Sequence, residues 1–459
     1  MSVIGRLLAE LADVVHVPGD DEYAAATRPD NSSFPQRPRA VVRPRSADEA
    51  ARAVQIIASM GIRIAVQATG HGAGAPIDEA DVLLDTSALD TVSVDVGART
   101  ARVGAGSMWP GVQEAAAPHG LLGLSGTSPT VGVAGYTFGG GVGWFVRKFG
   151  LAAAALRSVE YVDGSGRLRT ASLDAVDAVD REALWAFRGV APVGLATSVE
   201  IGLFPVADLW TGYLLWPASA LSGVVAAWTQ GIAAVDESVT SAFSLLRLPP
   251  EGPFPDELLG TSVVHLSYAS PDGGRPLGVM RDAVRAVATP VVDTTGPGDR
   301  TSLSAIHLDP PTAVPARGTG RWLDSNATDV ATAMFAVARI GEPHGLSMIE
   351  LRHTESKAAA HAGAPAPFLM HAVGAATDDA ARGKIDDVLR RVEVAGRPAD
   401  IGRAAPSFRE GQPDAADALA PGDVGRVRAA RNALDPDRTF VFQRHLESAR
   451  GADAPPGAV

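Results

Sequence analysis

Apolar residues in the N-terminal part of the chain recur first with helical spacing and then with strand spacing. Ser46 and Glu49 stand three residues apart, as in a capping box, and apolar positions at helical spacing follow until Gly61. This pattern predicts a helix, and the apolar stretch "IRIAVQA" at 62–68 predicts a strand after it. A second helix is expected in "SMWPGVQEAAAPHG", residues 107–120.

Shorter apolar segments with turn residues between them predict a sheet in the same part of the chain. Residues 80–106 alternate between apolar and polar positions, and residues 156–172 predict a hairpin that turns at Asp163 and Gly164. A last strand is expected in "SVEIGLFPV", residues 198–206. Among these segments, residues 120–150 form a long glycine-rich connection.

After about residue 206 the glycine clusters end and the pattern changes. The segments "WTGYLLWP", "TSVVHLSYAS", "SMIELRHTES" and "APFLMHAVGA" have strand character, and alanine-rich helices are expected near 218–234 and 376–394. Such a succession is typical of an antiparallel sheet with helices on one side. Since 459 residues exceed what one hydrophobic core usually supports, we expect two domains of the α+β class.

Composition removes several classes of function. The formal net charge of −12 disfavours nucleic acid as a partner, because such binding relies on lysine and arginine at phosphates. The chain has no cysteine, which excludes disulfides, thiolate metal ligands and cysteine nucleophiles. Its first residues lack the uninterrupted apolar core of a signal peptide, and no apolar run of about 18 residues follows. We therefore expect a cytoplasmic protein without a membrane partner.

Two glycine-rich stretches carry the candidate chemistry. His71 stands between glycines in "QATGHGAGAPID", and it is either a turn histidine with satisfied hydrogen bonds or a residue that carries a cofactor. In residues 120–150 the glycines leave backbone N–H groups uncovered, which suits the phosphates of a cofactor. Apolar residues among these glycines favour a folded loop over a flexible linker.

Other well-known sites are missing from the sequence. It contains neither a P-loop motif nor G-x-G-x-x-G between a strand and a helix, and it lacks the nucleophile elbow G-x-S-x-G. His353, His361 and His371 lack the spacing of zinc ligands, so no metal site is predicted.

Several motifs in a fixed order resemble a known family. "ATGHGAG", "VLLDTSALDTVSVD", "ARVGAGSMWPGVQEAAAPHGL" and "SPTVGVAGYTFGGGVGWFVRKFGLA" resemble the PCMH-type FAD-binding domain of the vanillyl-alcohol oxidase superfamily, within it the berberine-bridge-enzyme-like oxidoreductases. The resemblance covers about residues 36–206, and "RNALDPDRTFVFQRHL" is similar to the family's closing helix and turn. It implies an FAD-binding domain over 1–206, a substrate-binding α+β domain over 207–425, and a return to the FAD domain over 426–459. The composition of the tail after about residue 447 predicts disorder.

The resemblance implies an FAD-linked oxidase and assigns its cofactor site. A hydride would pass from a C–H bond of a small alcohol, sugar or secondary-metabolite substrate to flavin N5, and dioxygen would reoxidise the flavin. His71 stands at the family's position for a covalent bond to the 8α-methyl carbon of the flavin. The residues implied to bind FAD are Ala68, Thr69, Gly70, His71, Gly72, Gly126, Thr127, Ser128, Val131, Gly132, Gly135, Tyr136, Thr137, Gly139, Gly140, Gly141, Val142, Gly194 and Leu195.

Two departures from the family pattern affect this cofactor site. Ser128 stands where many relatives carry a cysteine bonded to the flavin, so at most one covalent link is expected, through His71. Pro192, after Val190 and Ala191, stands at the usual asparagine of a glycine-rich segment beside the pyrimidine edge of the flavin, and it removes a backbone donor.

The sequence leaves the catalytic base unassigned. "APSFREG" lacks the tyrosine and asparagine that the family often places before its last helix. Glu350, His353 and His371 are titratable candidates. The departures also keep open a non-redox protein on the same scaffold, which would bind or rearrange a small molecule with FAD structural or missing. Neither the substrate nor the oligomeric state follows from the sequence.

Overall fold

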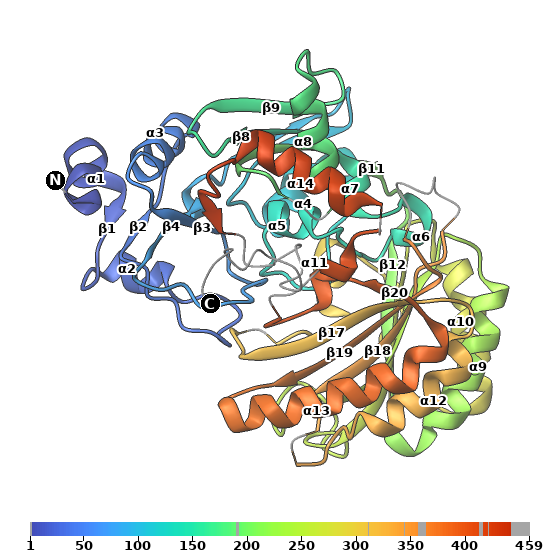
Figure 1. Cartoon of the computed structure of the whole chain (residues 1–459). Helices are drawn as coiled ribbons and strands as arrows, with labels where there is room; N and C mark the ends of the chain where they lie inside the picture. The colour runs from blue at the N-terminus through green and yellow to red at the C-terminus, as the bar shows by residue number, and fades with distance from the viewer. Residues whose placement is uncertain are drawn as a thin grey trace.

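The computed structural model describes residues 2–189, 192–310, 312–343, 345–356, 364–412, 416–420 and 422–441. Val190, Ala191 and His361 lie outside these ranges, as does the tail after about residue 447 for which we expect disorder. In Figure 1 an N-terminal half, blue to green, lies beside a second half, light green to orange, that is built on one large sheet. Within the described ranges, no helix has the length and apolar character that a membrane crossing needs.

The chain begins with a mainly parallel sheet. Its strands, in spatial order, are β1 (Val15–His16), β2 (Ala40–Val42), β4 (Asp81–Asp85), β3 (Arg63–Gln67) and β21 (Phe440–Val441). The helices α1 (Val3–Leu11) and α3 (Ala47–Ala58) share a hydrophobic core with this sheet, and α2 (Asp21–Ala26) follows β1. Ser46 Oγ accepts a hydrogen bond from the Glu49 N–H at 3.2 Å, so the predicted start of α3 is confirmed. β21 pairs in parallel with β3, which returns the chain to its first sheet.

An antiparallel sheet follows. Its strands, in order across the sheet, are β5 (Val92–Asp95), β6 (Thr100–Gly104), β10 (Leu195–Gly202), β8 (Leu156–Val162) and β9 (Leu168–Ser172). β8 and β9 form the predicted hairpin. The strands predicted in residues 80–106 do not form one sheet, because a short 3-10 helix (Thr86–Ala88) after β4 carries the chain from the first sheet to the second. Asp85 Oδ1 begins that turn by accepting a hydrogen bond from the Ser87 N–H at 2.9 Å.

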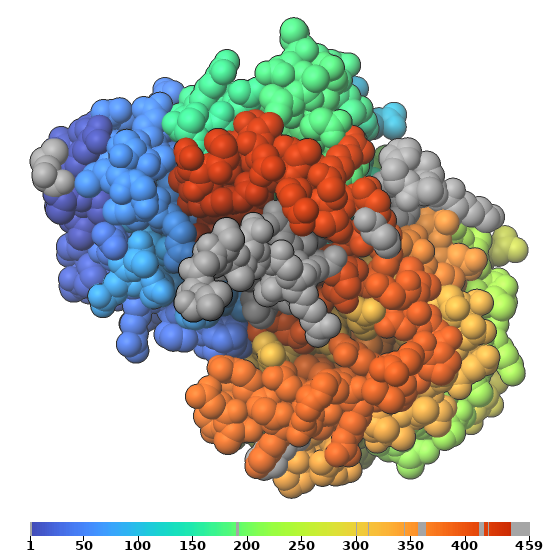
Figure 2. All heavy atoms as spheres, in the orientation of Figure 1, coloured from blue at the N-terminus to red at the C-terminus, as the bar shows by residue number. Residues whose placement is uncertain are grey.

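Residues 120–150 are not the plain connection that their glycines suggest. They contain the strand β7 (Leu121–Leu122) and the short helices α5 (Val133–Phe138) and α6 (Val146–Phe149), and most of their apolar side chains are buried. The other elements of this half are α4 (Trp109–Ala116), α7 (Ala152–Ala155), α8 (Ala178–Arg188) and β11 (Phe204–Pro205). The last helix, α14 (Asp423–Leu434), packs against α8, and Figure 2 shows its red residues beside green ones of the first half.

The second half is an antiparallel sheet with helices on one face, as the sequence predicts. Its strands lie in the order β15 (Val292–Asp293), β12 (Trp210–Pro217), β14 (Ser262–Ser270), β13 (Thr240–Arg247), β18 (Met348–His353), β19 (Phe368–Ala375), β17 (Ala316–Leu323) and β20 (Asp400–Ala404), while β16 (Gly296–Pro297) also pairs with β12. The helices α9 (Leu221–Ala234), α10 (Gly274–Val287), α12 (Ala327–Val337) and α13 (Asp379–Gly396) cover one face (Figure 1), and α11 (Arg300–Ala305) lies apart from them. The predicted α+β fold class is confirmed.

Hydrogen bonds from two buried side chains join the two halves. Arg147 of α6 donates to the carbonyl oxygens of Asp236 and Val239 at 2.6 Å each, just before β13. Trp144 Nε1 donates to the carbonyl oxygen of Leu303 at 2.9 Å. These contacts hold the glycine-rich segment of the first half against the second half.

Candidate functional site

A cavity of about 330 Å³ has walls from both halves. On the side of the first half, residues 66–73 and the stretch from Gly126 to Val142 line it. On the side of the large sheet, the lining comes from His307, Asp309, His371 and the loop after β20. One wall is therefore mostly backbone and small side chains, whereas the other carries titratable groups.

Most of the predicted cofactor-binding residues share this cavity. Those on its wall are Ala68, Thr69, Gly70, His71, Gly72, Gly126, Thr127, Ser128, Val131, Gly132, Gly135, Tyr136, Gly139, Val142 and Gly194. Pro192 lies on the wall as well. Thr137, Gly140, Gly141 and Leu195 do not line the cavity, and the side chains of Thr137 and Leu195 are fully buried in the protein.

Gly140 and Gly141 serve the backbone turn after α5. Their φ angles are +96° and +69°, a region that favours glycine. A Cβ atom at Gly141 would lie 2.6 Å from the Cβ of Ala152 and 2.6 Å from the Tyr136 ring. Both glycines therefore permit the turn, and Gly141 also permits close packing, which the glycine pattern of the sequence does not separate from ligand contact.

The His71 loop depends on a close approach of two backbone segments. Gly70 has a φ of +70°, and a Cβ atom on it would lie 2.4 Å from the Cβ of Pro29, so a larger residue does not fit. The Asp30 N–H donates to the carbonyl oxygen of Thr69 at 3.0 Å. His71 consequently stands in a tight turn, with 41% of its side chain exposed, on the cavity wall.

Helix α5 presents bare backbone to the cavity. Gly132 is its N-cap, and the Val133 N–H donates to the carbonyl oxygen of Ser107 at 2.9 Å, which fixes the start of the helix. Gly135 is exposed on the cavity wall, and no atom lies within 4 Å of the position that a Cβ would take. The neighbouring Tyr136 is buried, and burial raises the pKa of its hydroxyl.

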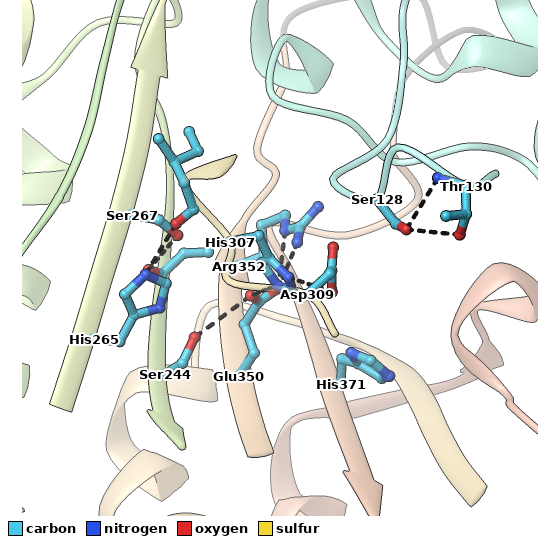
Figure 3. Close-up of polar contacts among 12 residues, drawn as sticks. Ser128, Thr130, Ser244, His265, Ser267, His307, Asp309, Glu350, Arg352 and His371 are labelled. Atoms are coloured by element: carbon cyan, nitrogen blue, oxygen red, sulfur yellow. Dashed lines mark hydrogen bonds and ion pairs between the residues drawn. The ribbon is translucent and has the colours of Figure 1, made fainter. Parts of the chain in front are cut away.

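A chain of charged side chains backs the opposite wall (Figure 3). His307 Nδ1 lies 2.9 Å from Asp309 Oδ1, and His307 Nε2 lies 2.7 Å from Glu350 Oε2. Arg352 Nε donates to Glu350 Oε1 at 2.9 Å, and its Nη1 donates to the carbonyl oxygen of Val142 at 3.1 Å. Glu350 and Arg352 are fully buried on β18, whereas Asp309 and His307 reach the cavity wall. The chain connects the cavity to the large sheet and, through Val142, to the first half.

The opposite charges of these neighbouring groups outweigh the effect of burial and keep each group ionised. Burial alone would lower the pKa of His307, but the carboxylates of Asp309 and Glu350 outweigh it and raise that pKa to about 10. Burial would raise the pKa of Asp309, yet the His307 cation holds it at about 2. Arg352 and His307 likewise overcome the effect of burial on Glu350 and keep its pKa well below the ordinary value. His307 is therefore an imidazolium at neutral pH.

Of the three catalytic candidates from the sequence, His371 lines the cavity and the other two do not. Glu350 is completely buried and bonded to His307. His353 stacks on Phe368 with ring centroids 5.4 Å apart, and burial lowers its pKa to about 3. Neither side chain reaches the cavity, which argues against a direct catalytic role for Glu350 and His353.

His371 lies on β19, opposite Glu350 of β18 in the sheet register. Its Nε2 lies 3.2 Å from Glu410 Oε2, and its ring packs edge-on against Phe408 at 4.9 Å. The Nδ1 atom is buried and has no hydrogen-bond partner among the described residues. A histidine held by a carboxylate through one nitrogen, with no partner at the other nitrogen, resembles the arrangement of a general base.

The sequence alone does not predict four of the charged residues at or behind the cavity wall: His307, Asp309, Arg352 and Glu410. One signal exists for Arg352, because it follows Glu350 by two residues in a strand and therefore shares its face of the sheet. No local pattern indicates that His307 meets a carboxylate 43 residues away. Glu410 lies in "APSFREG", where the family pattern directs attention to a missing tyrosine rather than to a carboxylate.

The cavity offers polar atoms and open space that suit a large polar ligand. The Tyr136 hydroxyl and Asp309 Oδ2, like His371 Nδ1, are buried without a hydrogen-bond partner in the described part of the chain. Buried polar atoms are normally bonded, so these three atoms leave unused hydrogen-bonding capacity in residues beside the cavity. Among the described residues, no group of three or more ligating side chains suits a metal ion.

Part of the first half matches a family model. The model of an FAD binding domain matches residues 38–172. The chain contains an FAD-binding domain. The His71 loop and the glycine-rich cavity wall from Gly126 to Val142 belong to this FAD-binding domain, so the cofactor expected from the sequence is FAD.

Curated relatives resemble part of the chain. (R)-6-Hydroxynicotine oxidase of Paenarthrobacter nicotinovorans is 28% identical over 225 residues, which cover 46% of this chain and 47% of that protein. Berberine bridge enzyme-like D-1 of Nicotiana tabacum is 33% identical over 180 residues, which cover 36% of this chain and 29% of that protein. The matched region thus spans about half, or less, of the length of these relatives.

Solved structures resemble the whole chain. BBE-like 1 of Physcomitrella patens has a TM-score of 0.80 at 19% identity, covering 97% of this chain and 100% of that one. 6-Hydroxy-D-nicotine oxidase of Arthrobacter nicotinovorans has a TM-score of 0.78 at 19% identity, covering 93% and 96%. The FAD-binding domain therefore sits in the fold of the berberine-bridge-enzyme-like proteins, and the resemblance found in the sequence is confirmed.

Gly135→Val is expected to reduce FAD binding while leaving the fold intact. The added side chain enters the cavity from α5, and an overpacked contact costs about 1–3 kcal/mol, which is about 5- to 150-fold in Kd. The ratio of flavin to protein absorbance measures the loss, and circular dichroism measures the fold. Gly383→Val is the matched control, because Gly383 is also exposed on a helix with no atom within 4 Å of its Cβ position. Equal flavin content in both variants would contradict the assignment of this wall.

Alkaline pH is expected to destabilise the protein through His307. Its pKa is raised from the ordinary 6.5 to about 10, so its stabilising contribution is complete below pH 6.5 and is lost as the pH rises to 10. One such proton contributes a slope of at most about 1.4 kcal/mol per pH unit. Urea unfolding between pH 7 and pH 10 measures the slope, which should be smaller in His307→Gln. Parallel pH profiles for the two proteins would refute this role.

Proposed function

We propose that the protein is an FAD-dependent oxidase that transfers a hydride from a C–H bond of a small alcohol, sugar or secondary-metabolite substrate to flavin N5, with dioxygen as the final acceptor. One observation carries the proposal: the glycine-rich stretch from Gly126 to Gly139 of the FAD-binding domain and the His371–Glu410 pair line the same cavity. The names of the similar proteins, which include oxidases, support the same class of reaction.

The residues of the first wall would hold the cofactor. Gly70, Gly126, Gly132, Gly135 and Gly139 line the cavity, and their lack of side chains would let the phosphates of the cofactor approach the backbone closely. His71 would form the single covalent link through its ring. Ser128 offers no thiol for a second link, and the chain has no cysteine at all. The cofactor supplies the acceptor for the hydride, and the protein supplies placement and proton transfer.

His371 would accept the proton that the substrate hydroxyl loses. When Nε2–H donates to Glu410, the lone pair lies on Nδ1, the atom without a partner among the described residues. Glu410 therefore selects the tautomer that can act as a base. Asp309 Oδ2 adds a hydrogen-bond acceptor on the same side of the cavity, which favours a ligand with a hydroxyl or amine donor.

A second function has one observation in its favour. Pro192 lies on the cavity wall and offers no N–H, so the backbone donor that relatives place near the flavin ring is missing at this position. A protein that binds or rearranges a small molecule without net redox change would tolerate that loss. Substrate-driven reduction of the flavin separates the two functions.

The flavin of the purified protein is expected to stay with the polypeptide after acid precipitation. Acid unfolds the chain and frees a bound cofactor but leaves a carbon–nitrogen bond intact, so the colour should remain in the pellet. His71→Ala should bind FAD and release it into the supernatant. Release of flavin from the unaltered protein would remove the covalent link from the proposal while leaving FAD binding in place.

Anaerobic mixing with a panel of sugars and secondary alcohols is expected to bleach the flavin absorbance, and air should restore it with formation of hydrogen peroxide. His371→Gln should slow the bleaching by about 10²- to 10⁴-fold, the usual contribution of a general base. Its flavin content should not change. His119→Gln, at an exposed position away from the cavity, is the control. A flavin that photoreduces promptly but is bleached by no substrate would favour the non-redox function.

A further inference from the structure

A carboxylate from an N-terminal loop faces the ring of His71. Asp30 Oδ2 lies 3.9 Å from His71 Nδ1. This oxygen is buried and has no hydrogen-bond partner within the described ranges, although a third of the Asp30 side chain is exposed. A buried carboxylate oxygen without a bonded partner is costly, so its position beside an imidazole calls for an explanation.

Backbone contacts on both sides hold Asp30 in this place. Its N–H donates to the carbonyl oxygen of Thr69 at 3.0 Å, and the next N–H, of Asn31, donates to that of Gly70 at 3.3 Å. On the other side, the Val314 N–H donates to the carbonyl oxygen of Asp30 at 3.1 Å. The Asp30 segment is thus fixed between the His71 loop and the chain leading into β17. The side chain itself makes none of these bonds and remains available to the ring.

The charges that face His71 come from two elements. Asp30 approaches from the first half, and Asp309 approaches from the second, where His71 is among the charges that lower the pKa of Asp309. Asp309 is already paired with the His307 cation at 2.9 Å. Asp30 has no cationic partner of that kind within the described residues, and its carboxylate is therefore the one available to the His71 ring.

We propose that Asp30 is a positioning residue for the covalent attachment of the flavin to His71. The proposal rests on the covalent link in the proposed function. A neutral imidazole attacks through a lone pair and becomes positively charged as the bond forms. A carboxylate at this distance stabilises the charge, and it would accept the ring proton when the two groups approach to hydrogen-bond distance.

Formation of the covalent bond releases two electrons and two protons, and dioxygen is the oxidant that takes them up. A C–H bond of the 8α-methyl group breaks, its proton leaves, and a bond forms between a ring nitrogen of His71 and the 8α carbon. The proton of the imidazole passes to Asp30 and on to solvent. The electron pair of the C–H bond enters the flavin ring and is taken up by dioxygen, which with the two protons forms one hydrogen peroxide for each link.

Asp30→Asn tests the proposal, because it keeps the backbone bonds and the shape of the side chain while removing the charge. The protein is made with FAD present and incubated in air, and acid-stable and acid-released flavin are measured over time. We expect the total flavin of Asp30→Asn to equal that of the unaltered protein. Acid-stable flavin should form about ten- to a hundredfold more slowly, the range of one charge-assisted contact. Asp30→Glu should recover part of the rate, and Asp48→Asn, at an exposed position on α3, should behave as the unaltered protein.

Each outcome decides the question. Slow attachment at full total flavin supports the proposal, since a merely structural role would lower the total. An unchanged rate overturns it, as does a loss of total flavin in Asp30→Asn. If the flavin of the unaltered protein is entirely released by acid, the covalent link itself fails, and this result appears before any variant is examined.

Discussion

Two arginines that cross between the halves of the molecule hold the site together. Arg352 reaches from β18 to the carbonyl oxygen of Val142, just beyond α5, and Arg147 reaches back from α6 to carbonyl oxygens before β13. Hydrogen bonds from a charged donor contribute about 1.5–3 kcal/mol each, so these contacts favour the joined arrangement of the halves. The FAD-binding domain by itself would lack the wall that carries His371 and Asp309.

The two walls of the cavity contribute different kinds of chemical group. The first half contributes mainly backbone and small side chains, which can approach a large cofactor closely, together with His71. The second half contributes titratable groups, and it separates them into two sets. Asp309, His307, Glu350 and Arg352 compensate one another and keep fixed charges, whereas His371 is oriented by a single carboxylate. These fixed charges give His371, the proposed base, a constant electrostatic environment.

Sequence patterns anticipate the local features of this molecule better than the contacts between its halves. The cap of α3, the hairpin of β8 and β9, and the sheet with helices on one face follow from short-range periodicity. The glycine-rich wall follows from motif order. The pairing of His307 with Glu350 does not, because strand register and a distant loop decide it. Gly141 is predicted to bind FAD, but it permits close packing instead. The sequence alone does not distinguish a glycine needed for packing from one that contacts a ligand.

The parallel pairing of β21 with β3 has a consequence for how the protein is made. Phe440 pairs with Ile64, so the first sheet is closed by residues that leave the ribosome after the entire second half. Until then β3 has an open edge, which is prone to pair with other chains. Contacts of such long sequence separation also form slowly. The strand that leads into the His71 loop therefore gains its second neighbour only after the second half has been synthesised.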